Sequence, residues 1–405
     1  MIDVIVIGAG ASGLISSIYA AKNNKKVLLI EKNKDCGKKL LITGNGRCNY
    51  YNENQNIKYY HSNDYDFLPF IIKKQYLEEV KSFFEKIGIV PKIKDGYYYP
   101  YSNQATSIQT ALIKEAKISG VDILLGEEVV KIEKKETFKV YTENHIFESK
   151  NIILATGSKA YPKTGSNGFG YDILKEFGHT IHPVLPALVS LKADTPYLKE
   201  WHGIRSDVKL ALFENDKKIG EDVGEVQLTN YGISGICTFN LSGKVSLGLY
   251  QHKKEHININ FLYPFSLENE EDFIIWMNKR NNKIQKRTIS DLLDGILNYK
   301  LVNLMLKLSG IKNETYWDDL SEKLKKCLGR YLTSFHILIV GTNDFDASQT
   351  CTGGVSLKEI KQNMESKIIE GLYVTGELLD IYGDCGGYNL TIAWITGMIA
   401  GGSIK

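Results

Sequence analysis

The stretch DVIVIGAGASG at residues 3–13 decides the fold of this 405-residue chain. An apolar run typical of a buried strand leads directly into a GxGxxG turn, and an apolar helical pattern follows the turn. In this context the first glycine permits a tight turn, the second lets the backbone approach a pyrophosphate, and the third lets helix and strand pack closely. The pyrophosphate would then lie at a helix N-terminus. The stretch therefore predicts a dinucleotide-binding β-α-β unit.

An acidic residue supports this interpretation. A second apolar strand, residues 26–30, runs into Glu31, which is close to the position where dinucleotide-binding proteins hold a ribose hydroxyl. A GxGxxG pattern alone is compatible with an ordinary glycine-rich turn. Strand, helix and acid in register favour binding, and they predict a dinucleotide with a free 2′-hydroxyl.

Composition sets wider limits. The chain is 43% hydrophobic and long enough for two or three domains. Its 50 Lys and Arg residues nearly balance 47 Asp and Glu residues, which argues against a nucleic-acid or membrane surface built on charge. Six cysteines without a CxxC pair or metal-ligand spacing suit a reducing compartment. With no signal-peptide pattern and no 18-residue apolar run, we expect a cytoplasmic protein with no metal and no membrane contact.

The order of patterns predicts a parallel, doubly wound sheet interrupted by an insertion. A buried-looking strand at 151–155 ends in Thr-Gly, at the sheet edge where nucleotide cofactors bind. From residue 186 short alternating segments indicate an inserted β domain, and apolar residues at helical spacing over 267–332 indicate a helical subdomain. A strand at 368–377 and an apolar helix from 388 return to the first fold.

The segment at 35–49 is glycine-rich and cationic, unlike an ordinary connection. We expect it to lie against an anion. A solvated basic loop is the alternative, because lysine pairs such as Lys38 and Lys39 are common on surfaces.

Together these motifs resemble those of the BaiN-like or aminoacetone-oxidase-like bacterial flavoproteins, a family of NAD(P)/FAD-dependent oxidoreductases. The resemblance rests on residues 8–13, 43–49, 155–157, 178–180, 186–188, 353–355, 376–377 and 386–390, which span nearly the whole chain. It implies an α/β fold: a Rossmann-like FAD-binding domain of the two-dinucleotide-binding-domain flavoprotein type, with an inserted β-rich domain and a small helical subdomain. The expected boundaries are 1–188 and 340–405 for the FAD-binding domain, 189–266 for the inserted substrate domain and 267–339 for the helical subdomain.

The resemblance also implies which residues bind FAD. The pyrophosphate would face Gly8, Gly10, Ala11, Ser12 and Gly13. The adenosine half would meet Glu31, Lys32 and the backbone of Val129. The phosphate and flavin side would be lined by Lys39, Thr43, Gly44, Arg47, Cys48 and Asn49, and the cofactor edge by Ala155, Thr156 and Gly157. The ribityl chain and pyrimidine ring would meet Gly376, Glu377, Gly387, Tyr388, Asn389 and Leu390.

The sequence assigns no catalytic acid or base. Where the family often has a histidine in the inserted domain, this chain has Asn230, which cannot exchange a proton near neutral pH. We expect His179 and His182 to be structural, and Cys351 and Cys385 to be buried thiols rather than redox groups.

The expected function is that of an FAD-dependent oxidoreductase that transfers a hydride between flavin N5 and a small organic substrate. A second nicotinamide fingerprint is missing, so NAD(P)H as reductant would visit the substrate cleft. The inserted domain, with Asn230 and Tyr231 as candidate pocket residues, would govern substrate choice. A flavin-dependent nucleic-acid-modifying protein, or a flavin-bound redox-responsive binding module, stays open as the alternative, although the near-neutral charge disfavours nucleic acid. The oligomeric state is left open.

Overall fold

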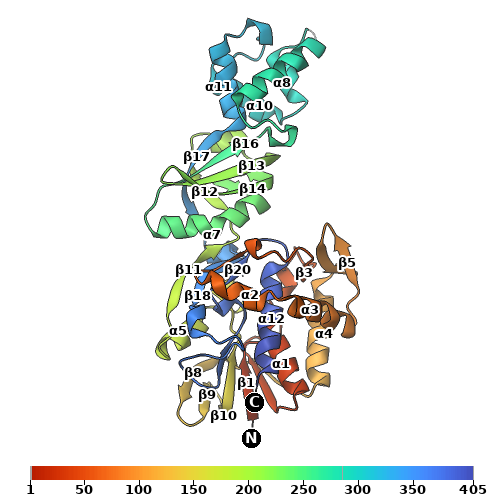
Figure 1. The fold of residues 1–405 in the computed structure, drawn as a ribbon, viewed down its shortest axis with the longest axis vertical. Coiled ribbons are helices and arrows are strands. Elements are labelled where there is room, and N and C mark those ends of the chain that lie inside the picture. Colours follow the sequence, from red (N-terminus) through yellow and green to blue (C-terminus); the bar gives the residue numbers. More distant parts are fainter. Residues whose placement is uncertain (1, 285, 405) are drawn as a thin grey trace. The chain divides into compact units, whose positions relative to one another are not determined.

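A computed structural model describes residues 2–284 and 286–404, and the chain forms two compact units (Figure 1). The first unit comprises Met1–Leu185 and Ser348–Lys405, and the second comprises Pro186–Ala347. The second unit is therefore an insertion between two stretches that fold together.

A seven-stranded sheet forms the centre of the first unit, in the order β7-β2-β1-β10-β9-β8 with β19 also paired to β10. Its strands are β1 (Ile2–Ile7), β2 (Val27–Glu31), β7 (Asp122–Leu125), β8 (Val129–Lys134), β9 (Phe138–Thr142), β10 (Ile146–Leu154) and β19 (Leu372–Val374). β7, β2, β1, β10 and β19 pair in parallel, whereas β8 and β9 form an antiparallel extension. The expected Rossmann-like parallel sheet is confirmed.

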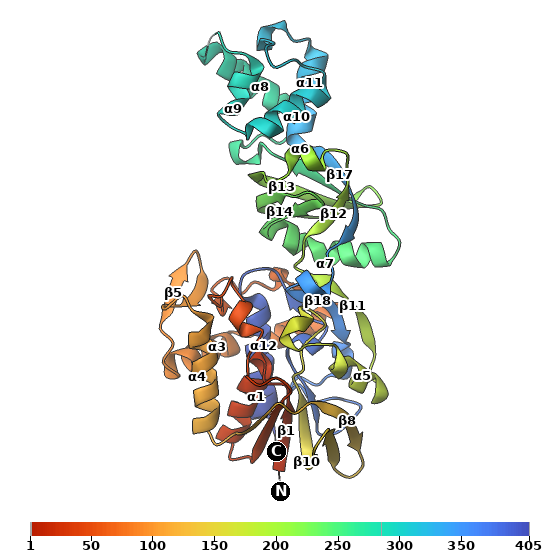
Figure 2. The same ribbon diagram turned by 180° about the vertical axis from the view of Figure 1, so that it is seen from behind.

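Two helices from opposite ends of the chain pack side by side in this unit (Figures 1 and 2). α1 (Ala11–Lys22) follows the glycine turn, and α12 (Tyr388–Gly402) closes the chain. A Cβ on Gly397 would lie 2.7 Å from the carbonyl oxygen of Ser12, and one on Gly401 would lie 2.2 Å from that of Ser16. Glycine therefore lets α12 approach α1 more closely than any other residue would.

The remaining elements of the first unit are smaller. Its other α-helices are α2 (Leu68–Ile71), α3 (Lys74–Lys86), α4 (Ala105–Ile118) and α5 (Phe169–Glu176). The periodicity over 70–90 predicts a single helix. The structure instead has two helices here, α2 and α3, separated by residues 72 and 73. Short paired strands are β3 (Tyr51–Asn52), β5 (Pro91–Lys94) and β6 (Tyr97–Pro100) in one sheet, β4 (Tyr60–His61) with β20 (Tyr382–Gly383), and β11 (Ile181–Ala187) with β18 (Thr350–Val355).

The second unit contains a closed antiparallel barrel in the order β12-β15-β14-β13-β16-β17. The strands are β12 (Leu191–Asp194), β13 (Arg205–Glu214), β14 (Lys217–Leu228), β15 (Gly232–Ser234), β16 (Glu255–Asn260) and β17 (Phe335–Thr342). The helices are α6 (Leu198–Trp201), α7 (Ile236–Tyr250), α8 (Glu270–Lys283), α9 (Ile289–Asp294), α10 (Tyr299–Ser309) and α11 (Glu322–Thr333). Barrel and helices share one hydrophobic core. The 15-residue helix α7 was not expected in this β-rich stretch.

Glu255, the first residue of β16, is a buried carboxyl group in the barrel. Neither of its carboxyl oxygens has a hydrogen-bond partner among the described residues. The group fits against Gly248 of α7, where a Cβ would lie only 1.8 Å from Oε1. Burial, with the nearby charge of Glu214, raises the pKa of Glu255 to about 7. The neutral acid is therefore the form that the folded barrel favours.

We expect the stability of the protein to fall between pH 4.5 and pH 7, because the unfolded chain releases this proton near the ordinary value of 4.5 and the folded chain keeps it to about 7. Glu255→Gln should remove that dependence and raise the free energy of unfolding at pH 8 by about 1–3 kcal/mol. Urea unfolding from pH 4.5 to 8 measures both. Glu225→Gln, an exposed control in β14, should retain the wild-type slope; equal slopes in all three proteins would contradict the assignment.

Candidate cofactor site

The glycine turn after β1 is shaped by two close backbone contacts. Gly8 has a φ of +98°, and a Cβ there would lie 2.6 Å from the carbonyl oxygen of Ala155, which directly follows β10. A Cβ on Gly13 would lie 1.8 Å from the carbonyl oxygen of Gly8. These two glycines are needed for the turn to pack against the sheet and the first turn of α1.

Gly10 is different, because a Cβ there would have no protein atom within 4 Å. It precedes α1 as its N-cap, with extended backbone and no side-chain cap. The amides of Ala11, Ser12 and Gly13 in the first helical turn have no partners inside the helix. Open space beside Gly10 and unpaired amides together form a cradle that fits a pyrophosphate.

Gly10→Ala should separate binding from folding. The added methyl group meets no protein atom, so the melting temperature of the cofactor-free protein should stay within about 2 °C of the wild type. The methyl group would occupy space needed by the pyrophosphate, so FAD affinity should fall at least about tenfold, or 1.4 kcal/mol. Titration of the cofactor-free protein with FAD checks this. Gly13→Ala is the opposite control: it should destabilise the cofactor-free protein itself.

Glu31 fixes the turn to the end of β2. Its Oε2 accepts a hydrogen bond from the backbone N–H of Ala9 at 2.7 Å. Its Oε1 accepts from the backbone N–H of Asn33 at 2.9 Å and from the side-chain amide of Asn33 at 2.7 Å. A carboxylate offers about four lone-pair sites, so ribose hydroxyl groups still find an acceptor here. Glu31 therefore has a structural role, and its binding of the ribose stays a prediction.

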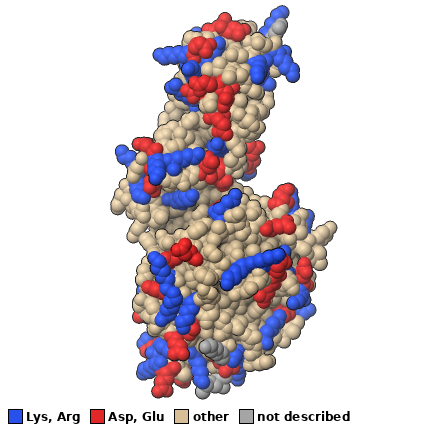
Figure 3. All heavy atoms as spheres, viewed as in Figure 1, with Lys and Arg blue, Asp and Glu red and all other residues tan. Residues whose placement is uncertain are grey.

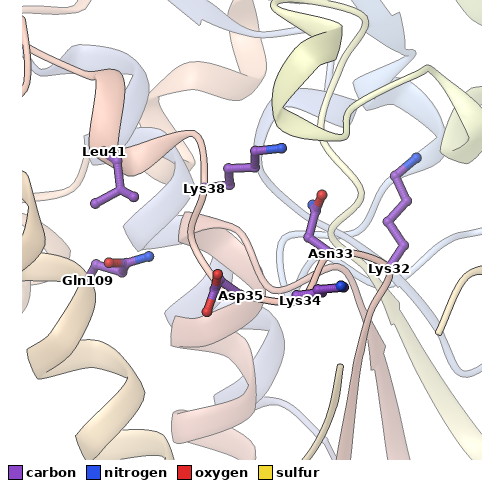
Figure 4. A pocket seen from close by; sticks show the side chains of 7 residues that line it. All are labelled: Lys32, Asn33, Lys34, Asp35, Lys38, Leu41 and Gln109. Carbon is purple, nitrogen blue, oxygen red and sulfur yellow. The ribbon is translucent and has the colours of Figure 1, made fainter. Parts of the chain in front are cut away.

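A hollow of about 690 Å³ is lined by residues that directly follow Glu31 in the sequence, beginning with Lys32 and Asn33 (Figure 4). Lys32 and Lys38 extend toward the same space, with Asn33 between them. The lining residues are Lys32, Asn33, Lys34, Asp35, Lys38, Leu41 and Gln109. Three lysines against one aspartate favour an anionic ligand, as expected for the phosphate side of a dinucleotide. Lys32 is also paired with Glu128 at 3.2 Å.

Glu31→Ala should weaken FAD binding by on the order of 1.5–3 kcal/mol, about ten- to a hundredfold, because a charged hydrogen bond to the ribose is lost. FMN lacks the adenosine half, so it should bind the wild type weakly. Its affinity should be the same for the wild type and for Glu31→Ala. Fluorescence titration with FAD and FMN measures both. Equal FAD affinities in wild type and variant, at matched melting temperatures, would contradict the ribose assignment.

The backbone of the loop at 43–49 is tightly folded, with residues far along the loop in close contact. Gly44 has a φ of +55°, and a Cβ there would lie 2.8 Å from the backbone nitrogen of Asn49. Cys48 also has a positive φ, +58°, and is buried. Burial raises the pKa of its thiol to about 12, so it is not a reactive thiolate. Thr43 donates its hydroxyl to the carbonyl of Leu40 at 2.7 Å, and Arg47 is exposed.

Two residues expected at the cofactor, Lys39 and Glu377, pair with each other. Their charged groups lie 2.7 Å apart. The hydroxyl of Ser158 donates to the same carboxylate at 2.8 Å, and the hydroxyl of Tyr171 donates to the backbone carbonyl of Glu377 at 2.8 Å. This network joins the cationic loop, the segment after β10 and the C-terminal motif, and it holds Glu377 in one orientation.

The C-terminal turn precedes α12. Gly387 has a φ of +92°, and a Cβ there would lie 2.9 Å from the carbonyl carbon of Tyr51. Its missing side chain therefore allows approach to β3. The side chain of Asn389 forms two hydrogen bonds with the backbone of Gly383, at 2.9 and 2.8 Å. The ring of Tyr388 stacks on that of Tyr59, with centroids 5.1 Å apart.

The other expected site residues lie in the same unit. Thr156 follows β10, and its buried hydroxyl oxygen has no hydrogen-bond partner among the described residues. Gly157 has a φ of +75°. Val129 is buried at the start of β8, and Leu390 and Gly376 belong to the C-terminal motif. The orphaned hydroxyl and the open cradle at Gly10 show that these residues fit FAD.

Two clusters were not anticipated from the sequence, since their members are far apart along the chain. In the first, Nε2 of His182 lies 3.9 Å from one carboxylate oxygen each of Asp64 and Asp380. Those oxygens already accept hydrogen bonds, from the Ser356 hydroxyl at 2.9 Å and from the Asn63 backbone N–H at 3.0 Å. These bonds give the two aspartates a structural role, whereas the buried Nε2 of His182 has no hydrogen-bond partner among the described residues. The second cluster joins His61 and Asp384.

Two of the candidates set aside at the sequence level, His179 and Cys351, are buried. His179 is buried and bonds the carbonyl of Leu174 at 3.2 Å and the hydroxyl of Ser366 at 2.9 Å. Cys351 is buried, and burial raises the pKa of its thiol to about 11. His179 is therefore a hydrogen-bonded buried residue and Cys351 is buried, as expected. Cys385 is only half-buried, which differs from the expected buried thiol.

A parallel sheet, an open helix N-terminus behind GxGxxG and an acid at the end of β2 define a dinucleotide-binding protein of the Rossmann type. A family model described as the HI0933-like protein Rossmann domain matches residues 2–403. The chain belongs to this family.

Relatives that align with nearly the whole chain carry functional names. The chain is 37% identical over 409 residues to a 3-dehydro-bile acid delta(4,6)-reductase of Clostridium scindens, covering 98% of this chain and 97% of the relative. It is 27% identical over 396 residues to a ribosomal RNA dihydrouridine synthase of Escherichia coli, covering 97% of this chain and 95% of that relative. The protein is an FAD-dependent oxidoreductase.

Solved structures support the fold. A flavocytochrome c3 fumarate reductase matches with a TM-score of 0.51 and 17% identity, covering 100% of this chain and 78% of the other. A 3-ketosteroid-delta4-(5alpha)-dehydrogenase of Rhodococcus jostii RHA1 matches with a TM-score of 0.51 and 14% identity, covering 99% and 96%. In the described part of the chain, no helix has the length and apolar character that a membrane span requires.

Proposed function

We propose that this protein uses FAD to reduce a carbon–carbon double bond conjugated to a carbonyl group in a small organic substrate. The observation that carries the proposal is the full-length similarity to the bile acid reductase. A delta(4,6)-reductase acts on double bonds, and a dihydrouridine synthase adds two hydrogens across a double bond of uracil that is conjugated to a carbonyl. Two relatives with different substrates thus have names that describe the same chemistry.

Bound FAD supplies two-electron hydride chemistry at N5 of the isoalloxazine ring. The residues of the chain would hold and orient it. The cradle at Gly10 would accept the pyrophosphate, and Glu31 would accept a hydrogen bond from the ribose. The N-terminus of α12, after Gly387, provides backbone amides and a helix dipole that favour negative charge at the pyrimidine edge of the flavin.

We propose NAD(P)H as the transient reductant and the second unit as the part that selects the substrate. All residues expected at FAD belong to the first unit. The sequence has no second nicotinamide fingerprint, so a nicotinamide would share the substrate site. We also propose that the protein works in the cytoplasm, which is a reducing compartment. Its proposed partners are small molecules.

Anaerobic reduction tests the proposal. The FAD-loaded protein is mixed with NADH or NADPH, and bleaching of the flavin absorbance is followed. The reduced protein is then mixed with a panel of simple enones and 3-keto-4-ene steroids. Reoxidation by an enone, with the saturated ketone as product, supports the function; reoxidation by oxygen alone would contradict it.

A flavin-dependent nucleic-acid-modifying enzyme is the second candidate, supported by the name of the E. coli relative. Lys and Arg side chains are interspersed with Asp and Glu on the face in Figure 3, which gives this candidate no obvious docking surface there. Binding to rRNA fragments at 50 and 200 mM salt distinguishes the two. An affinity that falls steeply with salt, about 10³-fold or more, together with turnover only on RNA, would favour the RNA enzyme.

Asn230→Ala and Tyr231→Phe should alter kcat/KM or substrate preference while leaving FAD content unchanged. Both residues lie between β14 and β15 in the second unit and are exposed, Tyr231 to 37%. The effect expected from one lost polar contact is about 0.5–1.5 kcal/mol, or two- to tenfold. Kinetics with an identified enone and the absorbance ratio of bound flavin measure the two effects. Kinetically silent variants would place the substrate pocket elsewhere.

A further inference from the structure

A histidine and a carboxylate are paired beside the C-terminal turn. His61 is the last residue of β4, and Asp384 directly follows β20. Nε2 of His61 lies 2.7 Å from Oδ1 of Asp384. Because β4 and β20 are antiparallel neighbours, with His61 opposite Tyr382, the two side chains meet on a short sheet. Asp384 is separated from Gly387, the N-cap of α12, by only two residues.

The pair is held in place from several directions. The ring of His61 stacks on that of Tyr382, with centroids 4.7 Å apart. The backbone N–H of Asp384 donates to the carbonyl of Tyr59 at 2.9 Å. The side-chain amide of Asn389 forms two hydrogen bonds with the backbone of Gly383, the residue before Asp384. These bonds tie the position of the imidazole to the turn that begins α12.

The pair is also suited to exchange protons. The side chains of His61 and Asp384 are 21% and 17% exposed, so water reaches them although they are mostly enclosed. A carboxylate that accepts from one imidazole nitrogen fixes the tautomer, stabilises the imidazolium and leaves the other nitrogen for proton transfer. Histidine gains and loses a proton in the neutral range, as general acid catalysis requires.

The neighbouring titratable groups are weaker candidates for this task. Burial raises the pKa of Tyr382 and of Tyr388 above their ordinary range, which makes them poorer acids. Lys58 lies over the ring of Tyr59, on the element before β4. Asp384 is the carboxylate that faces His61 directly.

We propose that His61, oriented by Asp384, supplies the proton that accompanies hydride transfer; this rests on the proposed function. In that reaction the β-carbon of the enone gains a hydride, whose electron pair comes from reduced FAD, so the cofactor is oxidised and the enone becomes an enolate. The α-carbon of the enolate takes a proton from the imidazolium N–H. Neutral His61 then regains a proton from water, and NAD(P)H reduces FAD again.

The first test needs no substrate. A group near the flavin whose pKa changes when the flavin is reduced adds a break to the plot of midpoint potential against pH. Beyond any break that belongs to the flavin itself, we expect one break in the wild type that is absent in His61→Gln and altered in Asp384→Asn, which removes the carboxylate paired with the imidazole. A His61→Gln plot identical to the wild type would overturn the proposal.

His145→Gln is the matched control. His145 also pairs with a carboxylate, its Nδ1 lying 3.5 Å from Glu127 Oε1, but on the β9–β10 turn of the same unit. Its potential plot should match the wild type. Loss of the break in this variant would show that any histidine change abolishes it, and would overturn the assignment to His61.

The second test measures proton delivery. The photoreduced protein is mixed with 4-androstene-3,17-dione, and flavin reoxidation is followed anaerobically. His61→Gln should slow reoxidation about 100- to 10,000-fold with wild-type FAD content, and Asp384→Glu should recover more of the rate than Asp384→Asn. A wild-type rate in His61→Gln would overturn the role of His61 alone. Failure of the wild type with this steroid and with simple enones would instead overturn the proposed function and, with it, the proton step.

Discussion

The close approach of two backbone segments in the first glycine turn is the constraint on which the rest of the structure depends. The carbonyl oxygen of Gly8 occupies the space where a side chain at Gly13 would be, 1.8 Å from the position of its Cβ. This contact sets the direction of α1 as it leaves β1. Glu31 then bonds Ala9 and fixes the turn to β2. With α1 set in this way, Gly397 and Gly401 bring α12 against it, and the two distant ends of the chain close one unit around the insertion.

Much of this unit could be predicted from the sequence because its determinants are local. The strand, turn, helix and acid of β1, α1 and β2 lie within residues 2–31, and α12 begins where its glycines indicate. α7 was missed for a physical reason. Its sequence contains Gly243, Gly248 and β-branched residues, and burial against the barrel stabilises a helix that its intrinsic preference does not favour.

The expected site residues lie in the unit that their motifs predict, but several contacts could not be foreseen. Lys39 and Glu377 form an ion pair across 338 positions of sequence, and His61 and Asp384 meet across 323. Pairing of this kind depends on strand register and loop packing, which no local pattern encodes. The same is true of Gly387, whose missing side chain lies against the backbone of Tyr51.

The division of the chain also bears on how one fold serves different substrates. Relatives named for a bile acid and for a ribosomal RNA base each align with more than nine-tenths of this chain, so their difference in substrate does not require a different architecture. The glycine turn at Gly10, Glu31 and the C-terminal turn all belong to the first unit, whose glycine contacts tolerate little change. The barrel and helices of the second unit have their own core. On the proposed function, this unit can therefore vary with the substrate while the first keeps FAD and the proton-donating pair in a constant arrangement.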